Sequence, residues 1–218
     1  VFDHVFAALE HSGQEPRQLG RGRSIRLLTY PTEQSSTPEP VDRRNPYVGL
    51  ASFDEGSQKY FYGRETVVQQ LCDRLLSSRV LTVFGPSGSG KSSLVKAGLI
   101  PELRQNGLPN SAQWEIVTMT PSSTPLKTLQ ERVSPYHQQS TPYVLFIDQF
   151  EELFTLCQDE TERSHFIQQI AAEVDHTPNL MKVIIAIRGD FLDRCAQIPD
   201  SAKLINRDNE LTAYMVTD

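Results

Sequence analysis

The sequence predicts an α/β fold of the three-layer type, in which a mostly parallel sheet lies between two layers of helices. One observation is that four apolar runs alternate with segments whose apolar residues recur at helical spacing; the runs are 80–84, 114–119, 143–147 and 181–187. Strands that are apolar along their whole length are typical of parallel sheets covered on both faces. A second observation is the glycine-rich loop 85–90, which joins the first run to a helix. The crossovers between such strands should be right-handed.

The first half of this fold can be assigned element by element. Residues 65–78 are expected to form a helix, because apolar side chains recur at helical spacing at Val67, Val68, Leu71, Leu75 and Leu76. The run 80–84 is the first core strand, and a helix at 90–105 follows the glycine-rich loop. The run 114–119 is expected to be the second strand.

The second half continues the alternation of strands and helices. After a Pro-Ser-Ser-Thr-Pro turn, Leu126, Leu129 and Val133 predict a helix. The third strand, 143–147, is entirely apolar, and the fourth is 181–187. Further helices are expected at 149–157, 161–175 and 190–197.

The beginning of the chain is predicted to lie outside this domain. Residues 1–10 place apolar side chains on one helical face, and 24–30 has the pattern of a short strand. Residues 31–46 hold four prolines among serine, threonine and glutamate, which is typical of an extended linker. We therefore expect a short N-terminal appendage at 1–30, a linker at 31–44 and the α/β domain at 45–218.

The composition argues against several classes of protein. A net charge of −6 gives no basic footprint for nucleic acid. The aliphatic runs are far shorter than the roughly 20 residues that span a bilayer, so no membrane partner is expected. No secretory signal opens the chain, and its first residue is Val1, so we expect a fragment of a longer protein.

The spacing of the cysteines and histidines indicates free thiols and no zinc site. Cys72, Cys157 and Cys195 are widely separated, and three thiols cannot all pair. Reduced thiols in the cytoplasm are the expected state. The five histidines do not cluster, so no zinc site is expected.

Residues 85–92 match the phosphate-binding pattern G-x-x-x-x-G-K-[ST]. Glycines let the backbone turn so that several N–H groups face anionic oxygens, and the start of the next helix adds partial positive charge there. Lys91 is expected to reach the β- and γ-phosphates, and the Ser92 hydroxyl to ligate Mg²⁺. The sequence thus predicts a P-loop NTPase fold that binds nucleotide through Gly85, Pro86, Ser87, Gly88, Ser89, Gly90, Lys91, Ser92 and Ser93.

An acidic stretch follows the third strand, in the order Asp148, Gln149, Phe150, Glu151 and Glu152. A carboxylate at the carboxyl end of a core strand beside a phosphate loop is a typical holder of Mg²⁺, which is the role expected of Asp148. Asp148 also fits the N-cap of a helix with Glu151 at the third position, and the two roles are compatible. Glu151 and Glu152 are both candidates to polarise an attacking water, and the sequence leaves the choice open.

Arg188 ends the fourth strand and is followed by Gly189 and Asp190. A guanidinium at this position suits contact with the γ-phosphate, so that it senses the presence of that group. The alternative is a surface arginine that pairs with Asp190 or Asp193.

Several segments together resemble the STAND class of P-loop ATPases (signal transduction ATPases with numerous domains), and most closely the novel STAND branch of bacterial multidomain proteins. The resemblance covers about 45–195, and its segments stand in the expected order: Asn45–Leu50 with Phe53, Phe61–Glu65, Gly85–Pro101, Leu145–Phe154 and Ala186–Phe191. This combination is far more specific than the phosphate-binding pattern alone.

The resemblance implies a molecular switch that is closed with ADP and active with ATP, often through self-association, and that is flanked by repeat and effector domains. It places Gly63 and Arg64 near the adenine-binding side, and it matches Arg188 to a sensor arginine. It also implies a fifth strand, a helical lid and a winged helix. The run 211–216 fits the start of that strand, so we expect 45–218 to be truncated before the lid and the winged helix.

The appendage at 1–30 resembles the tail of an effector domain, of the caspase-like kind in some bacterial relatives; an ordinary docking helix is the alternative. For the α/β domain, the leading hypothesis is a signalling switch that binds ATP or ADP with Mg²⁺ and hydrolyses ATP slowly. The alternatives are a nucleotide-binding scaffold with little hydrolysis and a P-loop kinase of a small molecule. The arginine-poor segment 105–130 argues against the kinase.

Overall fold

The computed structural model describes residues 61–205 and 213–216. The predictions for the appendage, the linker and the motif residues at 45–60 lie outside the described residues, and they stay predictions. Within the described part of the chain, no helix combines the length and the apolar character that crossing a membrane requires.

A sheet of five parallel strands forms the centre of the domain. The strands are β1 (Val80–Gly85), β2 (Glu115–Met119), β3 (Tyr143–Ile147), β4 (Leu180–Arg188) and β5 (Ala213–Met215). Their order in the sheet is β2-β3-β4-β1-β5, and every pair is parallel. The four predicted core strands are confirmed. The run 211–216 does contain the next strand, because β5 pairs with β1 from Thr82 opposite Ala213 to Phe84 opposite Met215.

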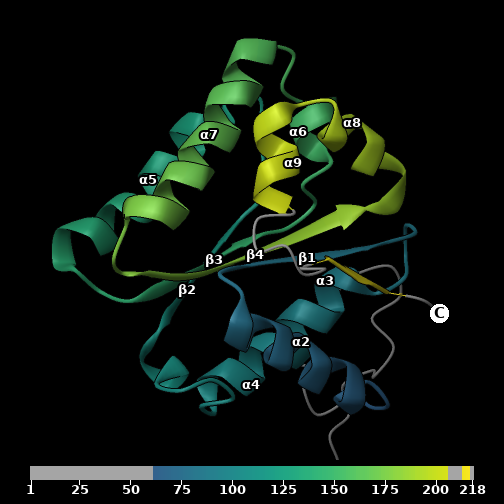
Figure 1. The fold of residues 1–218 in the computed structure, drawn as a ribbon, viewed down its shortest axis with the longest axis vertical. Helices are drawn as coiled ribbons and strands as arrows, with labels where there is room; N and C mark the ends of the chain where they lie inside the picture. The colour runs from purple at the N-terminus through teal and green to yellow at the C-terminus, as the bar shows by residue number, and fades with distance from the viewer. Residues whose placement is uncertain (1–60, 206–212, 217–218) are drawn as a thin grey trace, which may run out of the picture. The chain divides into compact units, whose positions relative to one another are not determined.

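Helices cover both faces of this sheet, which confirms the predicted α/β fold (Figure 1). One face carries α2 (Glu65–Ser77) and the segment after β1, which runs through α3 (Lys91–Ser93), the π-helical η2 (Leu94–Leu99) and α4 (Ile100–Arg104). The other face carries α5 (Pro125–Gln139), α6 (Glu152–Thr155), α7 (Glu160–His176), α8 (Leu192–Ala196) and α9 (Pro199–Ile205). Two short turns of 3₁₀-helix complete the described elements, η3 (Ser111–Gln113) and η4 (Gly189–Phe191).

The sheet separates two apolar cores, and alternate residues of each strand serve one core or the other. In β3, Val144 and Phe146 pack toward the α2 and α4 face, whereas Tyr143, Leu145 and Ile147 pack toward α5 and α7. All five side chains of this strand are buried. Burial on both sides explains why the strand is apolar without interruption.

The two neighbouring strands β1 and β4 send the chain to opposite faces of the sheet. From β1 it continues into α3 and α4, and from β4 it continues into α8 and α9 (Figure 1). In open parallel sheets, ligands bind at the carboxyl ends of strands where this divergence opens a crevice. The fold therefore directs attention to the loop after β1 and to the residues that end β3 and β4.

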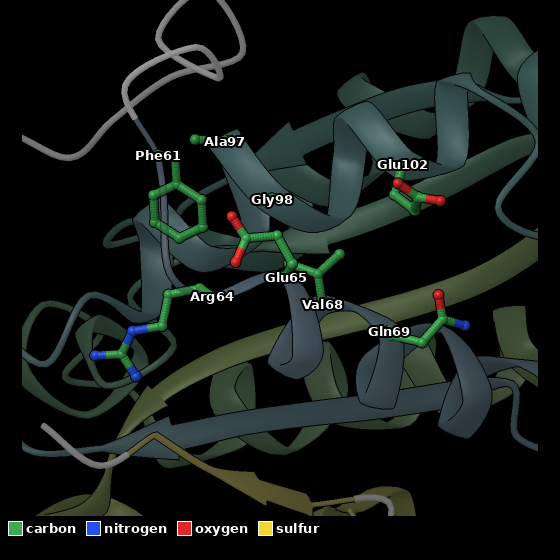
Figure 2. Close-up of a pocket in the computed structure, with 8 residues that line it drawn as sticks. All are labelled: Phe61, Arg64, Glu65, Val68, Gln69, Ala97, Gly98 and Glu102. Atoms are coloured by element: carbon green, nitrogen blue, oxygen red, sulfur yellow. The ribbon is translucent and has the colours of Figure 1, made fainter. Parts of the chain in front are cut away.

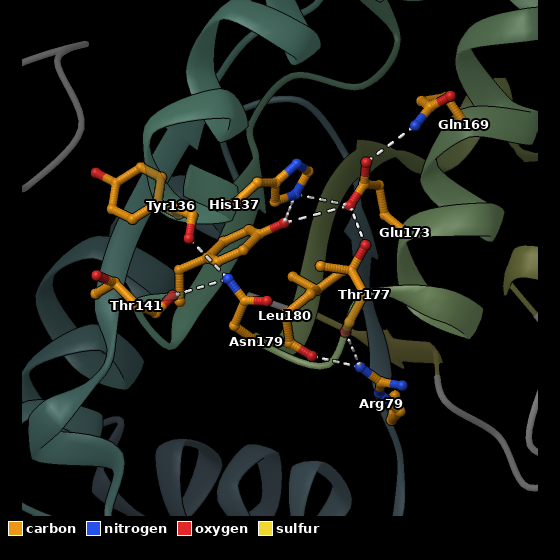
Figure 3. A network of polar contacts seen from close by, with 10 residues as sticks. Arg79, Tyr136, His137, Thr141, Gln169, Glu173, Thr177, Asn179 and Leu180 are labelled. Carbon is orange, nitrogen blue, oxygen red and sulfur yellow. Dashed lines mark hydrogen bonds and ion pairs between the residues drawn. The ribbon is translucent and has the colours of Figure 1, made fainter. Parts of the chain in front are cut away.

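The amino ends of the strands carry a different arrangement, a polar network around the buried carboxylate of Glu173 on α7 (Figure 3). Thr177 Oγ1 donates to Glu173 Oε2 at 2.6 Å, and Gln169 Nε2 donates to Oε1 at 2.9 Å. His137 Nε2 lies 3.0 Å from Glu173 Oε2, and the Tyr143 hydroxyl lies 3.1 Å from the same imidazole nitrogen. Burial, followed by the charge of Glu173, raises the pKa of the Tyr143 hydroxyl. The network joins α5, β3 and α7 at the amino ends of the strands. The glycine-rich loop 85–90, called the phosphate loop below, lies at the opposite, carboxyl ends.

Candidate functional site

The loop between β1 and α3 has the backbone that a phosphate-binding turn requires. Gly88 and Gly90 adopt φ values of 80° and 87°, which favour glycine. Gly85 has a different reason to be glycine, because a Cβ there would lie 2.6 Å from the carbonyl oxygen of Val216. The first helical turn closes when Leu94 N donates to Gly90 O at 2.7 Å. The predicted strand–loop–helix arrangement is therefore present.

The side chains of the loop differ in exposure. Pro86 and Ser87 are exposed, Ser92 and Ser93 are half-buried, and Ser89 is buried. Ser89 Oγ makes no hydrogen bond within the described residues. Since a buried hydroxyl without a partner is costly, this group suits a polar ligand in the loop.

Lys91 extends from the start of α3 back over the beginning of the loop. Its Nζ donates to Gly85 O at 3.1 Å and to Pro86 O at 2.6 Å, and the residue is 9% exposed. Burial lowers the pKa of this ammonium, and the nearby charge of Glu151 partly opposes that effect. The two carbonyls that hold the ammonium are neutral, so its positive charge remains to meet an anion beside the loop.

Ser92 and Asp148 meet, although they come from different elements. Ser92 Oγ donates to Asp148 Oδ1 at 2.6 Å, and the residue Asp148 is 3% exposed. The backbone of Asp148 continues the sheet, because its N–H donates to Met119 O at 2.9 Å. The phosphate loop and the end of β3 thus converge at one point, as the sequence predicts.

These two oxygen donors fit Mg²⁺. Magnesium prefers hard oxygen ligands, keeps several waters and usually takes one or two carboxylates together with substrate phosphates. A hydroxyl and a carboxylate beside a phosphate loop have that chemistry. Among the described residues no group of three or more histidine, cysteine, aspartate and glutamate side chains forms a metal cage. The donor set thus has the chemistry of the few protein ligands that Mg²⁺ takes beside phosphates.

The interpretation of Asp148 as a helix N-cap is wrong. The following helix, α6, begins at Glu152, its N-cap is Glu151, and no side chain caps it. Asp148 Oδ1 accepts instead from the adjacent Gln149 N at 3.0 Å. Gln149 adopts φ 50°, and this left-handed residue turns the chain out of the strand before a helix can start. The carboxylate therefore stays directed at the phosphate loop.

The two glutamates that follow this turn have different surroundings. Glu151 Oε2 accepts from the backbone N–H of Arg188 at 3.1 Å, which places its carboxylate at the carboxyl end of β4. Its charge has the largest electrostatic effect on the pKa of Lys91 and raises it. Glu152 begins α6, and its pKa is raised by partial burial, then by the charges of Glu151 and Asp148. Of the two, Glu151 lies beside the strand that separates Lys91 from Asp148.

Arg188 makes the surface ion pair that the alternative interpretation foresaw. Its Nε donates to Asp190 Oδ1 at 3.1 Å and its Nη2 to Oδ2 at 2.6 Å. The guanidinium also lies 5.3 Å from the ring centroid of Phe191. The side chain is 39% exposed, and its charge lowers the pKa of Lys91. Arg188 is therefore held by one exposed and one half-buried side chain, within electrostatic range of Lys91.

Gly63 and Arg64 directly precede α2 and come well before the phosphate loop 85–90 in the sequence. Gly63 adopts φ 80°, and its N–H donates to Glu65 Oε1 at 3.1 Å. Arg64 lines a pocket of about 220 Å³ between α2 and the helical segment after the loop; Figure 2 shows its lining, which is Phe61, Arg64, Glu65, Val68, Gln69, Ala97, Gly98 and Glu102. The pocket and the phosphate loop share one continuous helical segment, 91–104.

One residue of the site escapes the sequence prediction, and it is Lys96. Its Nζ lies 2.6 Å from Asp148 Oδ2. A signal was present in the sequence, because Lys96 follows Ser92 by four residues and side chains at that spacing share one face of a helix.

The sequence matches the model of one known protein family. The model of the family described as Novel STAND NTPase 1 matches residues 46–218. No curated protein matches the chain. Among solved structures, the chain is similar to the ORC2 protein of Aeropyrum pernix, determined as ADPNP-ADP complexes, with 11% identity and a TM-score of 0.44. That match covers 71% of this chain and 47% of the other, so this chain spans about half of that protein's length. The family model matches most of the sequence. The matched region contains the phosphate loop, the acidic end of β3 and the parallel sheet. The chain therefore belongs to the novel STAND NTPase 1 family.

Proposed function

We propose that the domain binds ATP or ADP together with Mg²⁺ and hydrolyses ATP slowly, as the switch module of a larger signalling protein. The observation that carries this proposal is the 2.6 Å hydrogen bond between Ser92 Oγ and Asp148 Oδ1. It joins the end of the phosphate loop to the acidic end of β3, and these are the two groups that hold Mg²⁺ beside nucleotide phosphates in P-loop NTPases.

Binding falls to the loop and to Lys91. The backbone of 85–90, the N-terminus of the helical segment 91–104 and the Lys91 ammonium form a site for the phosphates. Ser92 and Asp148 would hold Mg²⁺, which neutralises phosphate charge when it is bound. Ser89 Oγ supplies one further donor inside the loop.

We assign the polarisation of the attacking water to Glu151. Its carboxylate lies at the end of β4 and raises the pKa of Lys91, which places its charge near the phosphate-binding group. A general base must stand within reach of the water that attacks the γ-phosphate. Glu152 belongs to α6, and its pKa is raised first by partial burial and then by two neighbouring carboxylates. Its role in this proposal is secondary.

Arg188 serves as the group that senses the γ-phosphate. In the structure it bonds to Asp190 and lies over Phe191, and both contacts are with exposed or half-buried partners. Ion pairs of this kind stabilise weakly, so a triphosphate offers the guanidinium a stronger partner. Exchange between the two partners would connect the nucleotide state to the end of β4.

The base is proposed to lie on the side of Gly63 and Arg64, with adenine preferred. The pocket beside Arg64 presents the acceptors of Glu65, Gln69 and Glu102, which suit the amine of a nucleobase. The preference for adenine rests on the resemblance to the STAND class. Self-association and flanking effector or repeat domains remain part of the proposal for the whole protein. The resemblance to the STAND class supports this part of the proposal.

A scaffold with little hydrolysis is the second candidate, and one contact favours it. Glu151 Oε2 already accepts from the backbone N–H of Arg188, so part of the acceptor capacity of the proposed base is used within the protein. Turnover measured under saturating ATP separates the two candidates.

The test of nucleotide binding is Lys91→Ala, with Lys127→Ala as the matched control. Lys127 is 74% exposed on α5 and pairs loosely with Glu131 at 3.8 Å. Calorimetry should detect micromolar or tighter binding of ATP and ADP to the wild type and to Lys127→Ala, and none to Lys91→Ala. A Lys91→Ala protein that unfolds like the wild type and still binds ATP with the same affinity would overturn the proposal.

A further inference from the structure

Lys96 lies on η2, one helical turn beyond the metal-holding Ser92. Its Nζ is 2.6 Å from Asp148 Oδ2, and its side chain is 28% exposed while that of Asp148 is 4% exposed. The lysine therefore has access to solvent, whereas the carboxylate does not. A long flexible stem lets such an ammonium change its position at small cost.

Asp148 uses both of its oxygens in this arrangement. Oδ1 accepts from Ser92 Oγ at 2.6 Å and from Gln149 N at 3.0 Å, and Oδ2 pairs with Lys96. A carboxylate this deeply buried needs a compensating positive charge, because the charge is costly to bury alone. Lys96 provides that charge. Lys91 lies within electrostatic range of Asp148, but its ammonium bonds to carbonyl oxygens and not to the carboxylate.

The same carboxylate is the group that Mg²⁺ needs under the proposed function. A divalent cation approaching Asp148, directly or through its waters, meets an ammonium 2.6 Å from Oδ2. Two positive charges held on one carboxylate repel each other strongly in a partly buried site. Asp148 is fixed by its backbone hydrogen bond to Met119, so Lys96 is the partner that can move.

We infer that Lys96 competes with Mg²⁺ for Asp148, an inference that rests on the proposed function. The ammonium and the metal alternately neutralise one carboxylate, so binding of the metal-nucleotide complex releases Lys96. Lys96 thereby sets the Mg²⁺ concentration at which the metal contributes to nucleotide binding. It acts as a positioning residue through Asp148.

The experiment compares Lys96→Met with the wild type and with Lys127→Met in the full chain. Methionine keeps much of the side-chain length and removes the charge. ADP binding is measured by calorimetry in EDTA and across a series of MgCl₂ concentrations. We expect the half-saturating Mg²⁺ concentration to fall about tenfold in Lys96→Met, which corresponds to ~1.4 kcal/mol. Lys127→Met should match the wild type.

Two further measurements test whether the effect passes through Asp148. The melting temperature of Lys96→Met without added nucleotide or metal should fall, because Asp148 loses its compensating charge. In an Asp148→Asn background, Lys96→Met should no longer change the Mg²⁺ dependence. If Lys96→Met does not fold, Lys96→Gln replaces it, and Lys96→Arg, which keeps the charge, should retain the dependence of the wild type.

The outcomes are separable. An unchanged half-saturating concentration, or a higher one in Lys96→Met, would overturn the inference, since it would mean that Lys96 does not oppose the metal or that it orients Asp148 for it. Failure of the wild type to bind ADP at any Mg²⁺ concentration would instead overturn the proposed function.

Discussion

Ser92 Oγ and Asp148 Oδ1 lie 2.6 Å apart, although the strands that precede them, β1 and β3, are not neighbours in the sheet. The strand β4 lies between them and pairs with both. The hydrogen bond therefore spans the end of an intervening strand. It can do so because the helical segment that starts at Lys91 carries Ser92 over the end of β4 toward the acidic stretch.

Asp148→Asn should weaken Mg²⁺-dependent nucleotide binding while leaving metal-free binding largely intact. The amide keeps the size of the carboxylate and loses the negative charge that a divalent cation requires. We expect the ADP affinity in Mg²⁺ to fall about tenfold or more and the affinity in EDTA to change little. Calorimetry in the two buffers provides the comparison, and equal losses in both would contradict the role of Asp148.

Glu151→Gln should abolish most of the hydrolysis and spare nucleotide binding. Loss of a positioned general base lowers kcat by about 10²–10⁴-fold. Glu152→Gln is the matched control, because it removes an adjacent carboxylate that belongs to α6. Phosphate release under saturating ATP measures the rates, and calorimetry measures the affinities. Loss of hydrolysis in Glu152→Gln alone would transfer the role to that residue.

Glu173→Ala should destabilise the fold without changing nucleotide affinity. Removal of this buried carboxylate deprives His137, Thr177 and Gln169 of their common partner at the amino ends of the strands (Figure 3). We expect a loss of roughly 3 kcal/mol in the free energy of unfolding. Glu131→Ala, in an exposed pair on α5, should change it by less than about 0.5 kcal/mol. Denaturant titration measures both, and a changed ADP affinity in folded Glu173→Ala would contradict the separation of the two ends.

Alkaline pH should destabilise the protein partly through two thiols. Burial raises the pKa of Cys72 and of Cys195 from 9.0 to about 11, and the charges of Glu102 and Asp73 add to the effect at Cys72. In the unfolded chain these thiols lose their protons first, so the unfolded state binds fewer protons between pH 9 and 11 and stability falls as pH rises. Below pH 9 the contribution is fully present.

Each thiol should contribute a loss of roughly 2–3 kcal/mol over this range. The measurement is the free energy of unfolding at several pH values for the wild type and for Cys72→Ala/Cys195→Ala. The substituted protein starts from a lower stability because it loses buried atoms, so the slopes against pH are compared. Parallel slopes for the two proteins would contradict the prediction.

The strands of the sheet could be predicted well because each one is recognised from the apolar residues of its own short segment. Each of the four core strands is apolar along its length, and the glycine-rich loop follows the first of them. Parallel strands also bring their carboxyl ends to one edge, so Ser92 and Asp148 were expected to be close. The family resemblance is confirmed by the match over 46–218.

The remaining features depend on contacts that a pattern does not contain. The short helix α9 was not predicted, and α6 is shorter than expected because Gln149 turns the chain in a left-handed conformation. Glu151 bonds to the backbone of Arg188 whereas Glu152 starts α6, a difference that their adjacent positions in the sequence do not reveal. The pairing of Lys96 with Asp148 requires the two elements to be placed side by side. The choice of Asp190 over Asp193 as the partner of Arg188 likewise depends on the local path of η4.

The separation between the two ends of the strands has a practical consequence for spectroscopy. The end of α5, at Gln139 and Ser140, is exposed and lies beside the Glu173 network, at the amino ends of the strands, opposite the phosphate loop. The native thiols Cys72, Cys157 and Cys195 are all buried. A fluorophore attached to a cysteine introduced at Gln139 would therefore report tumbling and assembly of the domain while leaving the nucleotide crevice untouched.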